Sequence, residues 1–462
     1  MAAATTALAT LTLAILASAA AGPAPAWGLG PGAPNDPLFQ LQWSLTKVGA
    51  PGAWTTSTGK GVLIGIVDTG TDPNQEDLAG KVVASTDCVG SQGQEVACTG
   101  SANDDNGHGT HVAGIASAIA DNGRGIAGMA PDAKLVVAKV LDSSGSGNFN
   151  DVNAGIEWVV DHGARVVNLS LGSDMPALSG ILGNSLSSGV SYAWSHGAIP
   201  VLAAGNQNFF GLGSSNYGNA NAVVVGATGP NDEVAPYSSP LGNAKWALVA
   251  PGGDGQDSSG QPSCAGSAQA NCIVSTWWDS TNSTNAYAFD EGTSMATPLV
   301  SGVLALLLAK GLSPTAAVNT LLSTADHRVS CGTTCAGRLD AAKAVGVTTH
   351  QASPTPAGQT TPSTAPARSP QATPSPAAIS SVGSAPSSGG PGPGGEAAHP
   401  TGAAALASGT RGSVAPGTTQ PRSQPSSGSS GPPWEAAPAA AAAIGASGWF
   451  FYRRRRTVTT LP

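Results

Sequence analysis

Five short apolar runs, separated by stretches with a helical pattern, restrict the fold of this chain more than any other feature of its sequence. The runs are Val62–Val67, Leu135–Val140, Val166–Leu171, Ile199–Ala204 and Val223–Val225. Between them lie amphipathic segments such as Asp151–His162 and Gly189–His196. Strands that alternate with helices in this way pair in parallel and are covered by helices on both faces. The sequence therefore predicts an α/β fold around a mostly parallel sheet, with functional side chains on the loops after the strands.

The composition divides the 462 residues into a globular part and a tail. Up to about Val345 the chain carries most of its charged, aromatic and aliphatic residues, and after that Pro, Ser, Thr, Ala and Gly dominate. Only two of the 27 acidic side chains, but seven of the 19 basic ones, lie after Gly346, so the globular part is strongly acidic. A nucleic acid partner requires a basic surface, and we expect no such partner. The globular part, assigned to residues 34–346, is long enough to bury a core of its own.

The segment Glu291–Pro298, of sequence EGTSMATP, stands directly before the apolar run Leu299–Leu308, which is typical of a buried helix. Small residues flank Ser294, so the backbone can turn sharply and hold the hydroxyl at the start of that helix. A helix start has unpaired N–H groups and a positive dipole end, which stabilise an oxygen that becomes negative. A serine hydroxyl is a good nucleophile only with a base within hydrogen-bonding distance. The segment thus predicts a nucleophile and requires a histidine and a carboxylate elsewhere.

The chain supplies both a carboxylate and a histidine. The run Val62–Val67 ends in Asp68 and a Thr-Gly turn, which predicts a carboxylate at the end of a core strand. In the segment NGHGTHVAG, His108 lies between two glycines at the start of a helix of small residues. The order Asp, His, Ser is that of the subtilisin triad. Together the three segments resemble the subtilisin-like serine proteases, or subtilases, from about Asn35 to about Val345.

This resemblance implies a subtilisin-like three-layer fold and an Asp-His-Ser triad. By position in the motifs, Asp68 orients the imidazole, His108 is the general base and then the general acid, and Ser294 forms the acyl-enzyme. Asn206, in the AAGN segment after a buried run, matches the oxyanion amide of the family. We assign His111, on the same helix as His108, a structural role. The resemblance implies a serine endopeptidase that acts on polypeptides and needs no cofactor for its chemistry.

The resemblance also implies where a peptide substrate binds. Two segments of the chain match those with which the family brackets an extended peptide by strand addition. They are Ser144-Gly145-Ser146-Gly147 and Ser170-Leu171-Gly172. Phe149 is expected over a distal side-chain pocket and Gly205 in the primary specificity pocket. An ordinary loop is the alternative for either glycine stretch.

Acidic residues match a calcium site of the family. Asp77 in the segment EDL corresponds to its calcium-binding Asp, and Asp36 and Asn122 are expected to complete an oxygen cage. A solvated acidic loop without a metal is the alternative. We therefore expect a structural calcium ion that takes no part in the reaction.

The six cysteines fall into three close pairs. Local pairing in an exported chain gives the disulfides Cys88–Cys98, Cys264–Cys272 and Cys331–Cys335. A zinc site would need C-x-x-C spacing or nearby histidines, and neither occurs.

The N-terminal residues indicate export. Residues 1–21 are apolar and small and contain the cleavage pattern Ala17-Ser18-Ala19, which predicts a signal peptide, followed by a short extension at 22–33. An uncleaved anchor is the alternative, but the run is short for a membrane span.

The C-terminal residues indicate a tether. Residues 347–433 are rich in Pro, Ser, Thr, Gly and Ala and lack periodicity, which predicts a disordered linker. The alanine-rich segment 434–452 ends in aromatic residues and precedes four arginines in 453–462, a pattern of one transmembrane helix and a basic cytoplasmic tail. An alanine-rich end of the linker or a trimmed secretion signal is the alternative. We expect a single-pass protein of the cell membrane with its catalytic domain outside.

This layout is similar to that of the mycosins, subtilases associated with a secretion system, so components of such a system are expected partners. A second function class is open: a catalytically silent homologue that binds peptides or scaffolds a secretion complex. That reading predicts a missing triad or oxyanion residue, and none is missing. One departure from the family pattern is Leu299, which stands where subtilases usually have a histidine, and we expect altered packing there but no loss of activity.

Overall fold

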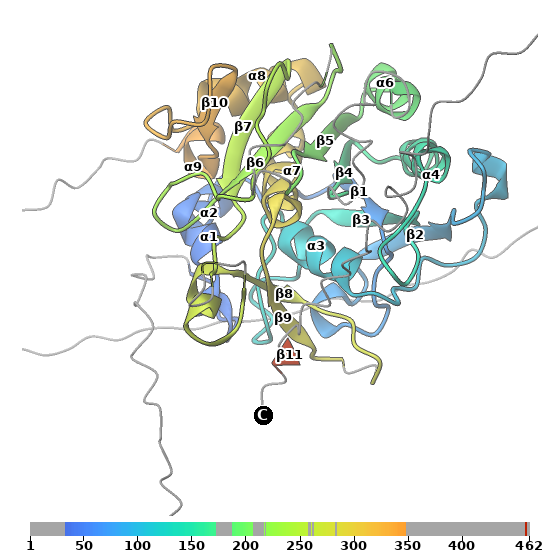
Figure 1. The fold of residues 1–462 in the computed structure, drawn as a ribbon, viewed down its shortest axis with the longest axis horizontal. Helices are drawn as coiled ribbons and strands as arrows, with labels where there is room; N and C mark the ends of the chain where they lie inside the picture. Colours follow the sequence, from blue (N-terminus) through green and yellow to red (C-terminus); the bar gives the residue numbers. More distant parts are fainter. Residues whose placement is uncertain are drawn as a thin grey trace, which may run out of the picture. The chain divides into compact units, whose positions relative to one another are not determined.

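One large sheet forms the centre of the described part of the chain. The computed structural model describes residues 33–171, 187–206, 217, 219–256, 260, 263–281, 284–347 and 458–459. The strands of the sheet are β1 (Leu63–Asp68), β2 (Val82–Asp87), β3 (Lys134–Lys139), β4 (Val166–Leu169), β5 (Ile199–Ala203), β6 (Val223–Thr228), β7 (Trp246–Pro251) and β10 (Cys335–Arg338). Their order is β10-β7-β6-β5-β4-β1-β3-β2, and each neighbouring pair is parallel (Figure 1). The expected α/β fold with a mostly parallel sheet is confirmed.

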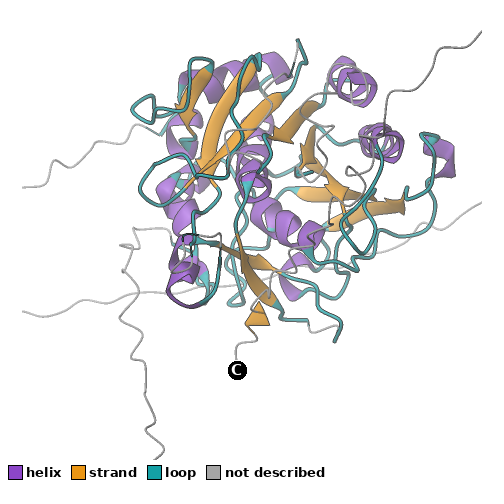
Figure 2. Ribbon diagram, in the orientation of Figure 1, coloured by secondary structure: helices purple, strands orange, loops and turns teal. Residues whose placement is uncertain are grey.

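Helices cover both faces of this sheet (Figure 2). They are α3 (His108–Ser117), α4 (Phe149–Asp161), α6 (Ser187–Ser195) and α7 (Thr293–Ala309). Side chains of α3 and α7 share one hydrophobic core, and those of α4 and α6 share a second. Successive strand residues point to opposite faces, so Ile64 and Ile66 of β1 enter the first core and Val67 enters the second. The sheet thus has a buried core on each side, as a three-layer fold requires.

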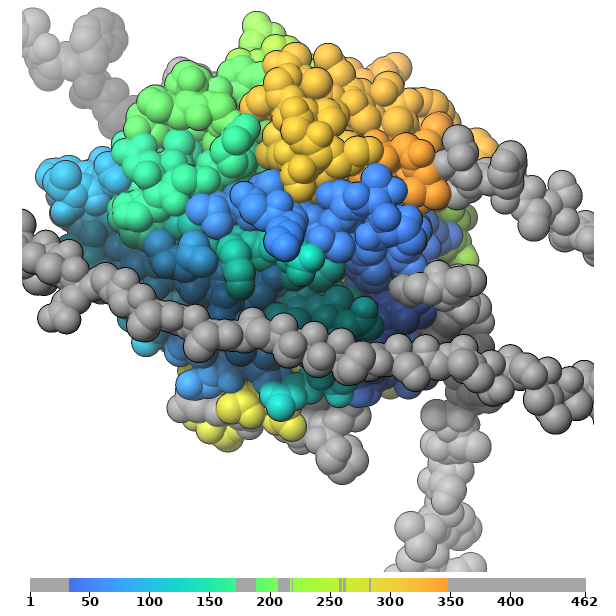
Figure 3. Space-filling model, turned by 180° about the vertical axis from the view of Figure 1, so that it is seen from behind, coloured from blue at the N-terminus to red at the C-terminus, as the bar shows by residue number. Residues whose placement is uncertain are grey.

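The N-terminal segments pack against the C-terminal end of the domain. The elements are η1 (Phe39–Leu41), α1 (Trp43–Lys47), α2 (Ala50–Trp54), α8 (Pro314–Ser323) and α9 (Ala341–Ala344). The Ala341 N–H donates to the Val48 carbonyl at 2.8 Å, and Arg338 donates to the Lys47 carbonyl at 2.9 Å. Figure 3 shows the N-terminal residues in blue beside the orange and gold segments near the end of the domain.

A small antiparallel sheet leads into α7. It consists of β8 (Ile273–Thr276), β9 (Tyr287–Asp290) and β11 (Val458–Thr459). Separate from this sheet, the chain forms the short 3-10 helices η2 (Glu76–Leu78), η3 (Glu95–Ala97) and η5 (Gly266–Asn271). Because β9 ends at Asp290 and α7 begins at Thr293, this sheet sets the direction from which the chain enters the helix. The pairing of β11 with β9 was not predicted, since residues 453–462 were expected to lie apart from the catalytic domain.

The predicted elements agree closely with the observed ones. All five apolar runs form strands, with ends that differ from the predicted ends by up to three residues, and the two amphipathic segments correspond to α4 and α6. The strand predicted to reach Leu171 ends at Leu169, so Ser170 and Leu171 belong to the loop after β4. Strands β2, β7, β8, β9 and β10 were not predicted. Within the described residues no helix is both long and apolar enough to span a membrane, and the predicted signal peptide, the predicted linker after Val347 and the segment 434–452 lie outside those residues.

The strand order reverses next to β1, which has β3 on one side and β4 on the other. At such a point the connections leave the sheet in opposite directions, and a crevice opens at the carboxyl ends of the strands. Asp68 is the last residue of β1, and Ser170 follows the last residue of β4. The fold therefore brings these two predicted site residues to the same edge of the sheet.

A buried carboxylate, Asp104, fixes the turn before α3 and so the position of His108. It accepts hydrogen bonds from the N–H groups of Asn106, Gly107 and Thr110 at 3.0 Å each. The hydroxyls of Thr110 and Thr69 donate to it as well, at 2.6 and 2.9 Å. Burial alone would raise the pKa of the Asp104 carboxyl, but these donors together lower it below its usual range.

Close packing also requires a glycine directly after His108. A Cβ atom on Gly109 would lie 2.1 Å from the Gly70 carbonyl oxygen. The absence of a side chain therefore lets the start of α3 contact the turn that follows Asp68.

We expect Asp104→Asn to lower the free energy of unfolding at pH 7 by on the order of 2 kcal/mol, because it removes charge-assisted hydrogen bonds. The folded-state pKa of Asp104 is depressed, so its contribution is present above the unfolded pKa of about 3.9 and is lost as the pH falls through the folded-state pKa. The difference between wild type and variant should therefore shrink below about pH 4. Urea unfolding of both proteins at a series of pH values above and below about pH 4 measures this difference in the free energy of unfolding. The variant Asp161→Asn, at an exposed carboxylate, is the control. A difference that is independent of pH would contradict this account of Asp104.

Candidate active site

Asp68 and His108 form a hydrogen-bonded pair at the end of β1. His108 Nδ1 lies 2.7 Å from Asp68 Oδ1, and the Asp68 side chain is fully buried whereas that of His108 is 18% exposed. A carboxylate can only accept, so Nδ1 carries a proton, and in the neutral imidazole the lone pair is then on Nε2. The Thr69 N–H also donates to Asp68 Oδ1, at 2.8 Å. The Asp68–His108 hydrogen bond therefore selects the tautomer of the imidazole that a general base requires.

Ser294 lies in the first turn of α7. It is the second residue of the helix and is only 4% exposed. Its hydroxyl donates to the Ser170 carbonyl at 3.0 Å, and the Ser170 hydroxyl donates to the Ser294 carbonyl at 2.8 Å. The nucleophile predicted from sequence is therefore held at the edge of the sheet where Asp68 and His108 lie.

Thr293 orients the side chain of Asn206. The Thr293 N–H and hydroxyl both donate to Asn206 Oδ1, at 3.0 and 2.9 Å. Because an N–H can only donate, the atom facing Thr293 is the amide oxygen, and Nδ2 is turned the other way. Gly292 leaves room for it, since a Cβ atom there would lie 3.2 Å from Nδ2. The amide is thus fixed as a donor beside the segment that carries Ser294.

Lys139 is a buried cation that joins three loops of the site. Its ammonium donates to the carbonyl oxygens of Thr69 and Leu141, both at 2.9 Å, and to Asp105 at 2.7 Å. Thr69 follows the triad aspartate, Asp105 lies in the turn before α3, and Leu141 leads into the first predicted peptide-binding segment. Sequence reasoning missed this residue, because a lysine inside a strand pattern gives no signal of what it will contact.

The first predicted peptide-binding segment is an exposed turn. The Asp142 carboxylate accepts from the N–H groups of Ser144 and Ser146, at 2.9 and 3.1 Å, and Gly145 has a positive φ of 77°. Ser144, Gly145 and Ser146 are exposed and Gly147 is half-buried, so a ligand can reach this turn, whose N–H groups at Ser144, Gly145 and Ser146 donate to Asp142. Asn106 donates to the Ser143 carbonyl at 3.1 Å and connects the turn to the His108 loop.

The remaining predicted subsite residues differ in their surroundings. Leu171 is buried, and Gly172 lies outside the described residues. Phe149 is half-buried and packs against the core under α4, so part of its ring serves the fold. Gly205 has a φ of 100°, and its N–H donates to the Thr293 hydroxyl at 3.1 Å, which connects it to the nucleophile segment.

The three predicted calcium ligands lie together. Asn122 Nδ2 donates to Asp77 Oδ1 at 2.9 Å, and the Asn122 N–H donates to Asp36 at 3.1 Å. Burial raises the pKa of Asp77 to about 6, and the neighbouring Asp36 carboxyl contributes to the rise. Burial also raises the pKa of Asp36. Two partly desolvated carboxyl groups beside an amide are a donor set that suits a hard cation.

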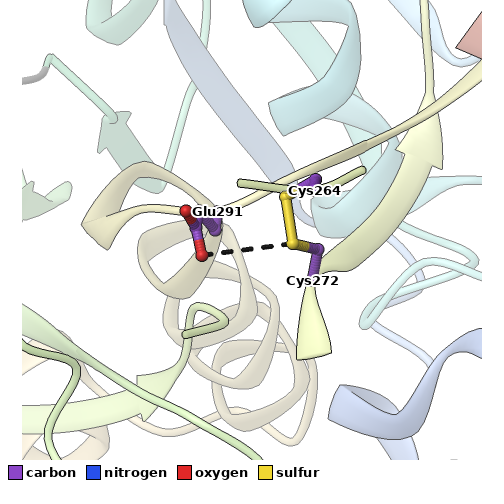
Figure 4. Close-up of side chains that lie close together, drawn as sticks. All are labelled: Cys264, Cys272 and Glu291. Carbon is purple, nitrogen blue, oxygen red and sulfur yellow. Dashed lines mark hydrogen bonds between the residues drawn. A yellow bond between two sulfur atoms is a disulfide. The ribbon is translucent and has the colours of Figure 1, made fainter. Parts of the chain in front are cut away.

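All three predicted disulfides are present, at Cys88–Cys98, Cys264–Cys272 and Cys331–Cys335. The second lies against the nucleophile segment: Cys272 Sγ is 4.0 Å from a carboxylate oxygen of Glu291, three residues before Ser294 (Figure 4). A sulfur in a disulfide carries no proton and cannot donate, so this is a packing contact. The disulfide restrains the loop from Cys264 to Cys272, against which the Glu291 side chain packs.

His111 is fully buried in α3. Its Nε2 lies 3.1 Å from the Ala288 carbonyl oxygen of β9. Its ring packs edge-on against that of Trp277, with the two ring centroids 6.0 Å apart. A ring fixed in this way joins α3 to the small sheet, which agrees with the structural role predicted for it.

Comparison with known proteins gives one consistent family. The family model described as "Subtilase family" matches residues 59–374. Thermitase of Thermoactinomyces vulgaris is 40% identical over 317 residues, which cover 68% of this chain and 99% of that protein. Subtilisin Savinase of Lederbergia lenta is 37% identical over 59% of this chain and 86% of its own.

A solved protease structure from Pseudoalteromonas arctica is also similar. It covers 68% of this chain and 98% of its own, with 31% sequence identity and a TM-score of 0.55. Because the family match spans more than half of the chain and includes the segments that carry Asp68, His108 and Ser294, the assignment does not depend on the fold alone. This chain belongs to the subtilase family and is a serine endopeptidase.

Proposed function

We propose that the enzyme cleaves polypeptides through an acyl-enzyme on Ser294, with His108 as the base, Asp68 as the group that orients it and Asn206 as oxyanion donor. The observation that carries the proposal is the short Asp68–His108 hydrogen bond at the sheet edge to which Ser294 is held. A hydrogen bond from Nδ1 to a buried carboxylate makes Nε2 the basic nitrogen and stabilises the imidazolium that forms.

The first half-reaction forms a bond between Ser294 Oγ and the carbonyl carbon of the substrate. His108 Nε2 takes the hydroxyl proton, and the carbonyl oxygen becomes an oxyanion that accepts from Asn206 Nδ2. His108 then gives the proton to the leaving amine as the C–N bond breaks. Water repeats these steps to release the acid. Before the attack the Ser294 hydroxyl must break its hydrogen bond to the Ser170 carbonyl. This hydrogen bond therefore belongs to the resting enzyme.

The substrate lies extended between the two segments identified above. The exposed backbone of Ser144–Gly147 and the loop after β4 bind its main chain by strand addition, the mode that gives affinity with little dependence on side chains. Gly205 contributes to the primary pocket. Endopeptidase action on many sequences follows from this mode of binding.

Ser294→Ala should abolish peptide hydrolysis and labelling by a fluorophosphonate while leaving the fold intact, because it removes only the nucleophilic oxygen. Labelling is read by gel fluorescence and folding by circular dichroism. Ser195→Ala, on the exposed end of α6, is the control and should label like wild type. If wild type never labels, or the alanine variant still does, the catalytically silent peptide-binding homologue becomes the better description.

We further propose that Asp36, Asp77 and Asn122 would hold a structural calcium ion. Two observations support this: their side chains lie within one hydrogen-bonded cluster, and burial disfavours the charge of both carboxyl groups. A bound divalent cation would offset that cost. Bound there, such an ion would stabilise the N-terminal segment and the loop after α3 and would take no part in the reaction.

Calcium at millimolar concentration should raise the unfolding temperature of wild type, and Asp77→Asn should remove most of this increase. A ligand that binds only the folded state stabilises it by about 2.7 kcal/mol at 100 times its Kd. Scanning calorimetry in calcium and in excess chelator measures the shift. Glu157→Gln on α4, which changes the same charge elsewhere, should respond like wild type. An identical midpoint with chelator and with calcium would contradict the calcium site.

Residues 434–452 anchor the enzyme in the cell membrane, with the catalytic domain outside and the linker 347–433 between them. As a helix, the segment Ala436–Tyr452 would be roughly 25 Å long, slightly less than the ~30 Å hydrocarbon core. Aromatic residues at its end favour the interface, and Arg453–Arg456 favour the cytoplasm. Insertion would separate β11 from β9, a ladder of two residues that is a weak contact by itself.

Full-length protein should fractionate with membranes after a carbonate wash, and a chain that ends at Gly431 should be released to the medium as active enzyme. Immunoblots of both fractions, with peptide hydrolysis in the medium, provide the measurement. Replacing Arg453–Arg456 by serine should reduce the membrane fraction, because the charge that stops translocation is lost. Full-length protein found mainly in the medium would exclude the anchor.

A further inference from the structure

Helix α7 contains a proline one turn after Ser294. In an α-helix the N–H of each residue donates to the carbonyl four residues earlier. Pro298 has no N–H, so the Ser294 carbonyl lacks the donor that it would have four residues later in a regular helix. Ser294 is buried, and a buried carbonyl without a donor costs on the order of one lost hydrogen bond. A donor from outside the helix can replace the one that is lost.

Ser170, directly after β4, supplies this donor. Its hydroxyl donates to the Ser294 carbonyl at 2.8 Å, while the Ser294 hydroxyl donates to the Ser170 carbonyl at 3.0 Å. A hydroxyl has a single proton, so Ser170 serves the Ser294 carbonyl only if nothing else attracts that proton. The direction of its O–H bond is therefore decisive for the start of α7.

Two further buried side chains fix this direction. Asn168 Nδ2 donates to Ser170 Oγ at 2.9 Å, and the Ser301 hydroxyl donates to Asn168 Oδ1 at 2.8 Å. Both Asn168 and Ser301 are fully buried. The donors run in one direction, from Ser301 to Asn168, to Ser170 and to the Ser294 carbonyl. If the Asn168 amide were reversed, its oxygen would face Ser170 and draw the hydroxyl proton away from Ser294.

The chain of donors begins and ends on the same helix. Ser301 lies two turns after Ser294 on α7, and Asn168 lies on β4, so the path crosses from helix to strand and back. Leu299 between them is fully buried in the apolar core and offers no polar atom. The hydrogen bond that Asn168 receives from a side chain of α7 therefore comes from Ser301.

We propose that Asn168 and Ser301 are positioning residues for the reaction: they orient the Ser170 hydroxyl, which holds the start of α7 in the register that the Ser294 nucleophile needs. This inference rests on the proposed role of Ser294. Neither residue touches the substrate, and both act through Ser170. Small displacements of a nucleophile reduce the rate strongly while leaving the substrate contacts in place.

The test compares Ser301→Ala with Ser301→Thr. The alanine removes the donor to Asn168 Oδ1 and allows the amide to reverse, so kcat and the rate of fluorophosphonate labelling should fall by about 10- to 100-fold. KM for a peptide substrate should stay within about twofold, because the binding segments are unchanged. The threonine keeps the hydroxyl and should restore the rate of wild type.

Ser117→Ala is the matched control. Ser117 is also fully buried, at the far end of α3 from His108, and its hydroxyl lies 3.0 and 2.8 Å from the carbonyl oxygens of Ala130 and Ala133, to which it can donate its one proton. The variant Ser117→Ala should have a lower free energy of unfolding than wild type and the same kcat. If Ser301→Ala lost stability in the same way and kept its kcat and labelling rate, the hydroxyl would serve the fold alone and the proposal would be overturned.

Two further measurements keep the outcome clear. Should Ser301→Ala fail to fold, Ser301→Cys keeps the side-chain shape with a weaker donor and should lower kcat at unchanged KM, because the weaker donor orients the Asn168 amide less firmly. A kcat like that of wild type would overturn the proposal. Failure of the proposed function is distinct, because wild type itself would then not label. The positioning role predicts graded rates among variants of an enzyme that does label.

Discussion

Burial of α7 is the interaction on which the geometry of the active site depends. Every residue from Thr293 to Leu308 is buried, and the helix contacts β1, β4, β5, β6 and β7. Each fully buried Leu or Val side chain contributes ~1.5–3 kcal/mol, so the helix cannot move over the sheet without a large loss of free energy. Because Ser294 is in the first turn of α7 and Asp68 ends β1, packing at the core also fixes the distance between the two ends of the site.

Local patterns in the sequence predicted the frame and the main site residues. The runs at β1, β3, β4, β5 and β6 were predicted because strands buried on both faces are continuously apolar. The segments around Asp68, His108 and Ser294 were recognised because each combines a reactive side chain with glycines or small residues at fixed spacing. Both signals lie within about ten residues, so no knowledge of the tertiary structure is needed to find them.

Long-range hydrogen bonds could not be predicted in the same way. Asp104 and Lys139 each join segments that come together only after the sheet has formed, and their own surroundings in the sequence resemble an ordinary loop and an ordinary strand. Strand β10 was missed because its residues, Cys335–Arg338, are neither apolar nor alternating. One signal was available: a proline four residues after a buried serine leaves a carbonyl that needs a donor from elsewhere.

The Ser294 carbonyl explains why the site combines an apolar core with small polar side chains at the strand ends. Helix starts are normally solvated, and water satisfies their free N–H groups. In this enzyme the start of α7 is buried, so protein groups must replace the water: Asn206 accepts from the Thr293 N–H, and Ser170 donates to the Ser294 carbonyl. Each partner stands just after β5 or β4, at the carboxyl edge where the crevice opens. A group that satisfies the helix start is thereby also placed beside the reacting serine, so the requirement of the fold and the requirement of the reaction select the same positions.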